Sequence, residues 1–344
     1  MIIVMKAESS QEDLDHLVEV IREAGLQAHI SRGAERTVVG AIGDEAKLQQ
    51  IPFIALAGVE TAMPIVKPYK LAGRAFRPEG SRIKIRDFEI GGNQIIVAGG
   101  PCSVEKNESL FETARAIKAS GAKLLRGGAF KPRTSPYDFA GLGEEGLQML
   151  SDAREETGLA IVTEVMDTRD VELVNKYADC FQIGTRNAQN FNLLREVGKY
   201  EKPVFLKRGM SMTVKEWLMS AEYVMSQGNR SVIMVERGIR TFETSTRNTL
   251  DLCAVCVVME ETHLPVFVDP SHAAGDFRFV SQLSKASVAC GCHGLMIEVH
   301  PLPEKAWSDG AQTLKFSKFD RLMEELRPIA EAVGKTVPSS TASV

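Results

Sequence analysis

The feature that most constrains the fold of this chain is a regular alternation of short apolar runs and helical stretches that starts near residue 95. The runs lie at 95–98, 123–126, 160–164, 180–184, 203–207, 231–235, 265–268 and 294–298. The stretches with helical spacing lie near 107–119, 143–157, 168–177, 190–199, 213–227, 245–261, 277–289 and 318–333. Eight such units over ~240 residues are typical of a (β/α)8 (TIM) barrel. Near-continuous apolar strands favour closure over the alternative, a doubly wound open sheet.

A separate block precedes this alternation. Its order is strand, helix, strand, strand, helix, strand, with Ser9 or Ser10 as the cap of the first helix. This is the order of a small ferredoxin-like α+β domain. The sequence therefore predicts four parts: a ferredoxin-like domain at 1–64, a linker and barrel-capping hairpin at 65–92, the barrel at 93–334, and a disordered tail at 335–344.

Composition narrows the possible functions. The 344 residues carry a formal net charge of -4, which gives no general attraction to nucleic acid or to an anionic membrane. No apolar run is long enough to span a bilayer, and the start lacks a signal-peptide pattern. Six scattered cysteines then suggest reduced thiols in a cytoplasmic protein.

Basic residues follow several of the predicted strands. Arg126 ends the second strand, and the loop Gly127–Tyr137 continues with a glycine pair and Lys-Pro-Arg-Thr-Ser. Further cations come after strands 4, 5 and 6, at Arg186, at Lys207 with Arg208, and at Arg237. The carboxyl ends of barrel strands share one face, so these cations are expected to converge. Rim salt bridges with Glu164 and Glu236 are the alternative, but they leave too much positive charge, and a phosphate- or carboxylate-bearing ligand is favoured.

The remaining strand ends carry a second set of polar groups: Cys102, His272, Glu298 and Asp309. One thiolate, one imidazole and two carboxylates suit a first-row divalent ion, without a strong preference among Mn, Fe, Zn and Co. Two other cysteine clusters, Cys290–His293 and Cys253 with Cys256, are expected to serve packing, the first at the opposite end of the barrel.

Six motifs, in chain order, resemble those of 3-deoxy-D-arabino-heptulosonate 7-phosphate (DAHP) synthases. They are Gly-Pro-Cys-Ser-Val-Glu (100–105), Lys-Pro-Arg-Thr-Ser (131–135), Gly-Thr-Arg-Asn (184–187), Lys-Arg-Gly-Met (207–210), Asp-Pro-Ser-His-Ala (269–273) and Ser-Asp-Gly-Ala-Gln (308–312). The resemblance is to the branch with an N-terminal ferredoxin-like domain. It implies condensation of phosphoenolpyruvate with erythrose 4-phosphate, the first step of the shikimate pathway to aromatic amino acids.

The resemblance also implies a role for each motif residue. Lys131, Cys102 and His272 would take part in catalysis, with Lys131 as the proton donor. Phosphoenolpyruvate would be held by Arg126, Lys131, Arg186, Lys207 and Arg237. Erythrose 4-phosphate would be held by Pro132, Arg133, Thr134 and Ser135. A divalent metal ion, Mn²⁺ above Fe²⁺, Zn²⁺ or Co²⁺, would be bound by Cys102, His272, Glu298 and Asp309.

The resemblance also leads to expectations about regulation and assembly, and two alternative functions remain. The family's N-terminal domain implies feedback inhibition by tyrosine or phenylalanine, and a homotetramer is expected. One alternative is 3-deoxy-D-manno-octulosonate 8-phosphate synthase, which uses arabinose 5-phosphate and typically reads Lys-Ala-Asn-Arg where this chain has Lys131-Pro132-Arg133. The other is a non-catalytic sugar-phosphate sensor, against which the intact metal quartet argues.

Overall fold

The computed structural model describes residues 1–33, 36–64, 67–133, 135 and 137–339. The chain forms two compact units, Met1–Pro68 and Tyr69–Val344. Thr134 of the predicted substrate loop lies outside the described residues. Among the helices that are described, none is both long and apolar enough to cross a membrane.

The first unit is an antiparallel sheet with two helices. Its elements are β1 (Ile2–Met5), α1 (Gln11–Glu23), β2 (Gln27–Arg32), β3 (Thr37–Ile42), α2 (Glu45–Gln50) and β4 (Val59–Met63). The strands lie in the order β2-β3-β1-β4, which confirms the ferredoxin-like prediction. Ser10 caps α1 as expected, because its hydroxyl accepts from the Asp13 amide while the Asp13 carboxylate accepts from the Ser10 amide.

The second unit is the predicted closed barrel. Its parallel strands are β7 (Ile96–Gly100), β8 (Leu124–Arg126), β9 (Ala160–Glu164), β10 (Cys180–Ile183), β11 (Val204–Lys207), β12 (Val232–Glu236), β13 (Val266–Val268) and β14 (Gly294–Glu298). Pairing of β14 with β7 closes the barrel.

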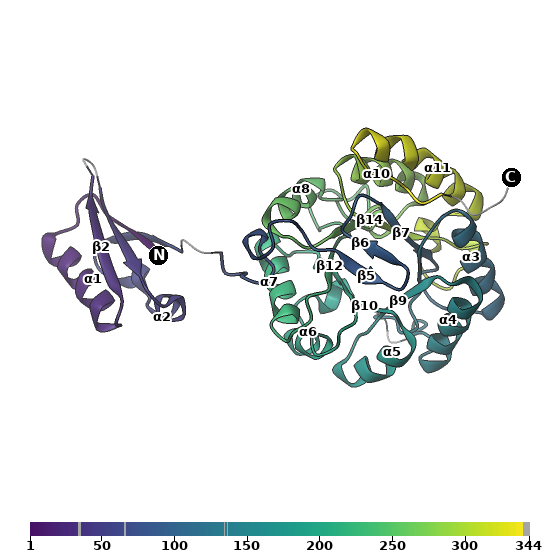
Figure 1. Ribbon diagram of the computed structural model, residues 1–344, viewed down its shortest axis with the longest axis horizontal. Helices are drawn as coiled ribbons and strands as arrows, with labels where there is room; N and C mark the ends of the chain where they lie inside the picture. The colour runs from purple at the N-terminus through teal and green to yellow at the C-terminus, as the bar shows by residue number, and fades with distance from the viewer. Residues whose placement is uncertain (34–35, 65–66, 134, 136, 340–344) are drawn as a thin grey trace. The chain divides into compact units, whose positions relative to one another are not determined.

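Helices form a ring around these strands (Figure 1). They are α3 (Asn107–Ala119), α4 (Glu144–Thr157), α5 (Val171–Tyr177), α6 (Phe191–Val197), α7 (Val214–Met225), α8 (Leu252–Glu261), α9 (Pro270–Ala274), α10 (Phe277–Ala289) and α11 (Phe316–Ala332). Short 3-10 turns lie at Phe53–Ala55, Arg74–Phe76, Thr168–Asp170, Thr185–Asn187, Pro303–Lys305 and Gly310–Gln312.

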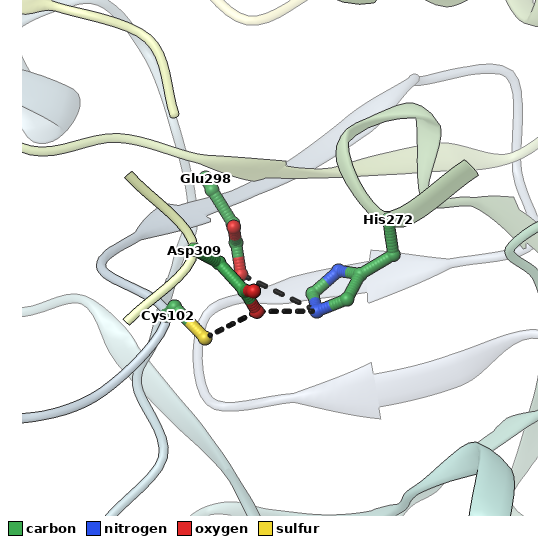
Figure 2. A group of neighbouring side chains, drawn as sticks. All are labelled: Cys102, His272, Glu298 and Asp309. Atoms are coloured by element: carbon green, nitrogen blue, oxygen red, sulfur yellow. Dashed lines mark hydrogen bonds and ion pairs between the residues drawn. The ribbon is translucent and has the colours of Figure 1, made fainter. Parts of the chain in front are cut away.

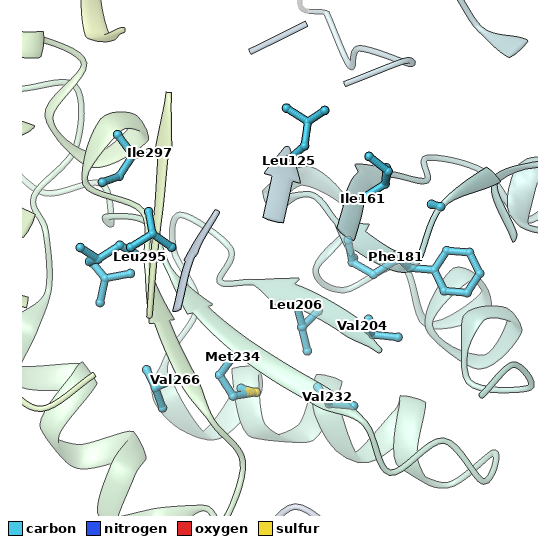
Figure 3. Close-up of a cluster of buried hydrophobic side chains, with 14 of the residues drawn as sticks. Leu125, Ile161, Phe181, Val204, Leu206, Val232, Met234, Val266, Leu295 and Ile297 are labelled. Atoms are coloured by element: carbon cyan, nitrogen blue, oxygen red, sulfur yellow. The ribbon is translucent and has the colours of Figure 1, made fainter. Parts of the chain in front are cut away.

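Two apolar layers explain why the strands read as unbroken apolar runs. Figure 3 shows the layer between strands and helices, with Leu125, Ile161 and Leu206 among its members. Alternate residues, such as Phe205 and Phe267, point into the barrel, where their rings meet edge to face. The hairpin of β5 (Ile83–Ile85) and β6 (Phe88–Ile90) packs its apolar side chains against this inner layer. Both faces of every strand are therefore buried.

Residues just before the hairpin are attached to the barrel. The Glu222 carboxylate, on α7, accepts hydrogen bonds from the amides of Lys70, Leu71 and Ala72. Gly73 then pairs with Thr262 at the end of α8. Residues from Tyr69 on, which the sequence places in a linker, thus belong to the barrel unit.

The helix expected at 245–261 begins only at Leu252. The Asp251 side chain accepts from the Ala254 amide and caps the helix there, while the amides of Arg247 and Asn248 donate to the carbonyls of Ala274 and Ala273. Residues 245–251 are therefore a loop, and the early helix start was wrong.

Two further expectations fail. Residues 335–339 are not a disordered tail, because Thr336 exchanges backbone hydrogen bonds with Asn93 and Ile95 beside the first barrel strand. Cys253 and Cys256 are exposed, since α8 buries its other face through Ala254, Val255 and Val258. Cys292, in contrast, is buried at the start of β14, at the barrel end away from the strands' carboxyl termini, as predicted.

Candidate active site

A cavity of about 290 Å³ lies at the carboxyl ends of the barrel strands, and its walls are mainly cationic. All five residues predicted to bind phosphoenolpyruvate line it: Arg126, Lys131, Arg186, Lys207 and Arg237. Pro132 and Arg133 line it too, whereas Ser135 is not among the lining residues and accepts the Tyr137 amide through its hydroxyl. Such a concentration of positive charge in a protein of net charge -4 is typical of a site for an anionic ligand.

The four predicted metal ligands meet at the same end of the barrel (Figure 2). Cys102 follows β7, His272 lies on α9, Glu298 ends β14, and Asp309 follows Pro303–Lys305. One ligand atom from each lies within 4.8 Å of the others. Cys102 Sγ is 3.1 Å from Asp309 Oδ2, and His272 Nε2 is 3.4 Å from Glu298 Oε1. These donors fit a divalent first-row ion.

Asp269 fixes the imidazole of this cluster. Its carboxylate caps α9 by accepting the His272 amide at 2.9 Å, and its Oδ2 lies 2.8 Å from His272 Nδ1. The same oxygen accepts from Lys207 Nζ at 2.6 Å. The ring is thereby held with Nε2 toward the other three ligands, as in carboxylate–histidine–metal arrangements.

A glycine is required at the end of β7. Gly100 has φ 141°, and a Cβ there would lie 2.0 Å from the Arg126 carbonyl oxygen. The two strand ends can approach this closely only without a side chain. Gly100 therefore brings the Cys102 loop beside Arg126.

Protonation states are consistent with a metal centre. Burial, with the charge of Glu298, raises the pKa of the Cys102 thiol to about 12. Without a metal ion the sulfur therefore keeps its proton, and the thiol donates a hydrogen bond to Asp309 Oδ2. Burial lowers the pKa of His272, which favours the neutral imidazole that ligates metal ions. A bound cation would replace the thiol proton.

Lys131 connects the two halves of the site. Its ammonium group donates to the Cys102 carbonyl and lies 3.0 Å from Cys102 Sγ. Burial acts to lower the pKa of Lys131, but the hydrogen bond to the Cys102 sulfur and the charge of Glu164 outweigh burial, and the pKa is raised. Lys131 is thus protonated at neutral pH, beside the metal ligands.

Two buried polar atoms mark where a ligand would bind. Arg126 donates through Nη1 to Glu298 and to the Pro101 carbonyl, but its Nε has no partner among the described residues. Glu164 Oε1 is likewise buried without a hydrogen bond from them. Unsatisfied buried groups are rare in folded proteins and are expected where a ligand or water supplies the partner.

The positions of several residues differ from the sequence-based prediction. Arg208 is buried away from the cavity and pairs with Glu236 and Asp251. Gln182, Arg240, Arg247 and Asn248 line the cavity but were not singled out. Arg247 and Asn248 were missed because the sequence suggested a helix from 245; a basic, polar run directly after the sixth strand was the available signal.

A closed (β/α)8 barrel with a cationic cavity and four candidate metal ligands at its strand ends is typical of metal-dependent barrel enzymes that act on phosphorylated substrates. Residues 78–333 match the DAHP synthetase I family, and residues 1–67 match the DAHP synthase ferredoxin-like domain. The chain belongs to the DAHP synthetase I family.

Individual relatives agree with this assignment. A phospho-2-dehydro-3-deoxyheptonate aldolase of Thermotoga maritima is 49% identical over 98% of this chain and 100% of its own length. The crystal structure of the Thermotoga maritima enzyme, described as a DAHP synthase, superposes with a TM-score of 0.91 over 98% of each chain. A 2-dehydro-3-deoxyphosphooctonate aldolase of Syntrophotalea carbinolica is 31% identical over 72% of this chain and 95% of its own.

Proposed function

We propose that this chain is a DAHP synthase. It joins C3 of phosphoenolpyruvate to the aldehyde carbon of erythrose 4-phosphate, water adds at C2, and inorganic phosphate leaves. The observation that carries the proposal is the meeting of five cationic side chains and four metal ligands in one cavity. The match to a DAHP synthase across both units supports it.

Phosphoenolpyruvate fits the cationic wall. Arg126, Arg186 and Arg237 offer planar guanidinium groups, while Lys131 and Lys207 offer ammonium groups. Five positive charges match the phosphate and carboxylate of this compact anion. The same groups would stabilise the negative charge on phosphate as it leaves C2.

The aldehyde end of erythrose 4-phosphate is assigned to the space beside the four candidate metal ligands. Cys102, His272, Glu298 and Asp309 would hold a divalent ion, with Mn²⁺, Fe²⁺, Zn²⁺ and Co²⁺ all compatible with these donors. When bound, the ion supplies Lewis acidity toward the aldehyde oxygen. Lys131, protonated and 3.0 Å from Cys102 Sγ, is placed to give that oxygen a proton as the carbon–carbon bond forms.

The phosphate end of erythrose 4-phosphate is assigned to the loop after β8. Arg133 lines the cavity, with its Nη2 3.4 Å from an Asp138 oxygen. Pro132 fixes the backbone between Lys131 and Arg133. Ser135, outside the cavity lining, would reach the phosphate only after a rearrangement of this loop.

Phosphate release tests the proposal. The protein with Mn²⁺ and phosphoenolpyruvate is expected to release phosphate with erythrose 4-phosphate and at most weakly with arabinose 5-phosphate. A preference for arabinose 5-phosphate would instead assign the reaction of the phosphooctonate aldolases that match the barrel. If phosphate is released with neither sugar, the chain would instead be a protein that binds sugar phosphates without converting them.

The first unit is proposed to regulate this reaction. It is a ferredoxin-like domain of the kind found in DAHP synthases, with a hydrophobic core of its own. Feedback inhibition by tyrosine or phenylalanine, bound through this domain in a homotetramer, follows from the family resemblance.

A further inference from the structure

Two side chains that no proposed role uses lie directly behind the carboxylate ligands. Gln312, only 2% exposed, ends the 3-10 turn Gly310–Gln312 that follows Asp309. Its Nε2 donates to Glu298 Oε2 at 2.7 Å, and its Oε1 accepts from Arg247 Nη1 at 2.9 Å. Arg247 Nη1 also lies 3.2 Å from Asp309 Oδ1. Gln312 and Arg247 thus bridge the two carboxylates.

This bridge engages one oxygen of each carboxylate and leaves the other directed to the cluster. The free oxygen of Asp309 is Oδ2, which lies 3.1 Å from Cys102 Sγ and 3.9 Å from His272 Nε2. For Glu298, the inner oxygen is Oε1, which lies 3.4 Å from His272 Nε2 and accepts from Arg126. Each carboxylate therefore has an outer oxygen on the bridge and an inner oxygen among the ligands.

The position of Arg247 is fixed by the segment that carries His272. The Arg247 amide donates to the Ala274 carbonyl at 3.0 Å, at the end of α9. Gly275, with φ 70°, leaves the space that Arg247 fills, because a Cβ there would lie 2.5 Å from Arg247 Cβ. The bridge is therefore held by a backbone hydrogen bond to the helix that carries His272 and by side-chain contacts to both carboxylates.

We propose that Gln312 and Arg247 are positioning residues that make Glu298 and Asp309 each present a single oxygen to the metal ion. The inference rests on the proposed metal-dependent function. A carboxylate with both oxygens free can chelate an ion through both and occupy an additional coordination position. With one oxygen of each held back, four protein donors would hold the ion, and room would remain for water or the substrate aldehyde.

The test replaces Gln312 with a side chain of similar size that cannot form either hydrogen bond. Gln312→Met is expected to weaken Mn²⁺ binding about 10- to 100-fold, the usual effect of losing an outer partner of a metal ligand. In Co²⁺-loaded protein the sulfur-to-metal absorption of Cys102 should persist while the d–d bands change. Arg247→Met should change the same bands through Asp309.

Lys315→Met is the matched control, because Lys315 follows the same turn but pairs with the exposed Glu304. It should leave the Mn²⁺ affinity and the Co²⁺ bands as in the parent. Unchanged affinity and bands in folded Gln312→Met protein, with only a lower melting temperature, would overturn the proposal. Neither readout involves a sugar phosphate, so failure of the bridge is distinguishable from failure of the proposed DAHP synthase reaction.

Discussion

At the scale of single residues, the four proposed metal ligands lie at the rim of the barrel rather than in its apolar core. Cys102→Ala and His272→Ala are expected to lose bound metal and activity while remaining folded. Chelator-treated parent protein should be inactive and should recover with Mn²⁺. Metal analysis, circular dichroism and phosphate release measure the three properties.

Cys290→Ala is the control for these variants, because Cys290 caps the far end of α10 and lies away from the cluster. It should keep both metal and activity. An active chelated protein, or a stoichiometric metal content in Cys102→Ala, would contradict the assigned ligands.

The Arg133 guanidinium group is the residue assigned to the sugar phosphate. Its side chain is about one quarter exposed and forms an ion pair with Asp138 at 3.4 Å. Arg133→Ala should raise KM for erythrose 4-phosphate roughly ten- to a hundred-fold, since a hydrogen bond to a charged group contributes about 1.5–3 kcal/mol. KM for phosphoenolpyruvate should change little. Equal effects on both substrates in steady-state kinetics would show that the loop is misassigned.

At the scale of elements, a titrating group, His293, lies directly before β14. His293 Nδ1 accepts the Val266 amide at 3.1 Å, and burial, aided by the charges of Lys335 and Arg74, lowers its pKa to about 4. The unfolded chain, with an ordinary pKa of 6.5, binds the proton first. The stability that neutral His293 contributes is thus fully present above pH 6.5 and is lost as the pH drops toward 4.

Between pH 7 and pH 5, this group should lower the free energy of unfolding by about 2 kcal/mol. His293→Gln keeps an acceptor for the Val266 amide but does not titrate. Urea unfolding of the parent and the variant at both pH values measures the difference. Parallel losses of stability in the two proteins would show that His293 is not the group responsible.

The sequence predicted the barrel elements well because both faces of each strand are buried, which makes every strand an apolar run. It also predicted that the candidate metal ligands come together, because one rule, that functional groups follow barrel strands, selects Cys102, His272 and Glu298. It failed where position within an element decides the outcome. Cys253 belongs to a residue type that is usually buried, yet it lies on the exposed face of α8.

Other features depended on contacts between residues far apart in the chain. The ordering of Thr336 results from backbone hydrogen bonds to residues 93 and 95, which no local pattern records. The bridge from Gln312 to Arg247 joins two loops separated by 65 residues. Such pairings are visible only in the folded structure.

At the scale of the whole molecule, the two units have separate hydrophobic cores. A chain starting at Lys67 should therefore fold and keep its activity, because every residue assigned to catalysis lies in the second unit. The full-length enzyme should be inhibited by tyrosine or phenylalanine, whereas the shortened enzyme should not. Phosphate release at increasing amino-acid concentrations measures both.

Inhibition through a separate domain requires the ligand to prefer one of two states, so it should also slow amide exchange in residues of the first unit. Tryptophan serves as the comparison amino acid. A full-length enzyme indifferent to all three amino acids, or a shortened enzyme that is still inhibited, would favour a purely structural role for this unit.

Closure of the barrel by β14 against β7 has a consequence for protein synthesis. The partners Ile96 and Gly294 are separated by almost 200 residues, so the ribosome adds residues for roughly 10 to 40 seconds between them. The first unit, whose core is complete by Val59, can fold as soon as it emerges. During this interval the unfinished barrel has unpaired strand edges, which promote aggregation, so chaperones should matter most for the yield of folded protein at this stage.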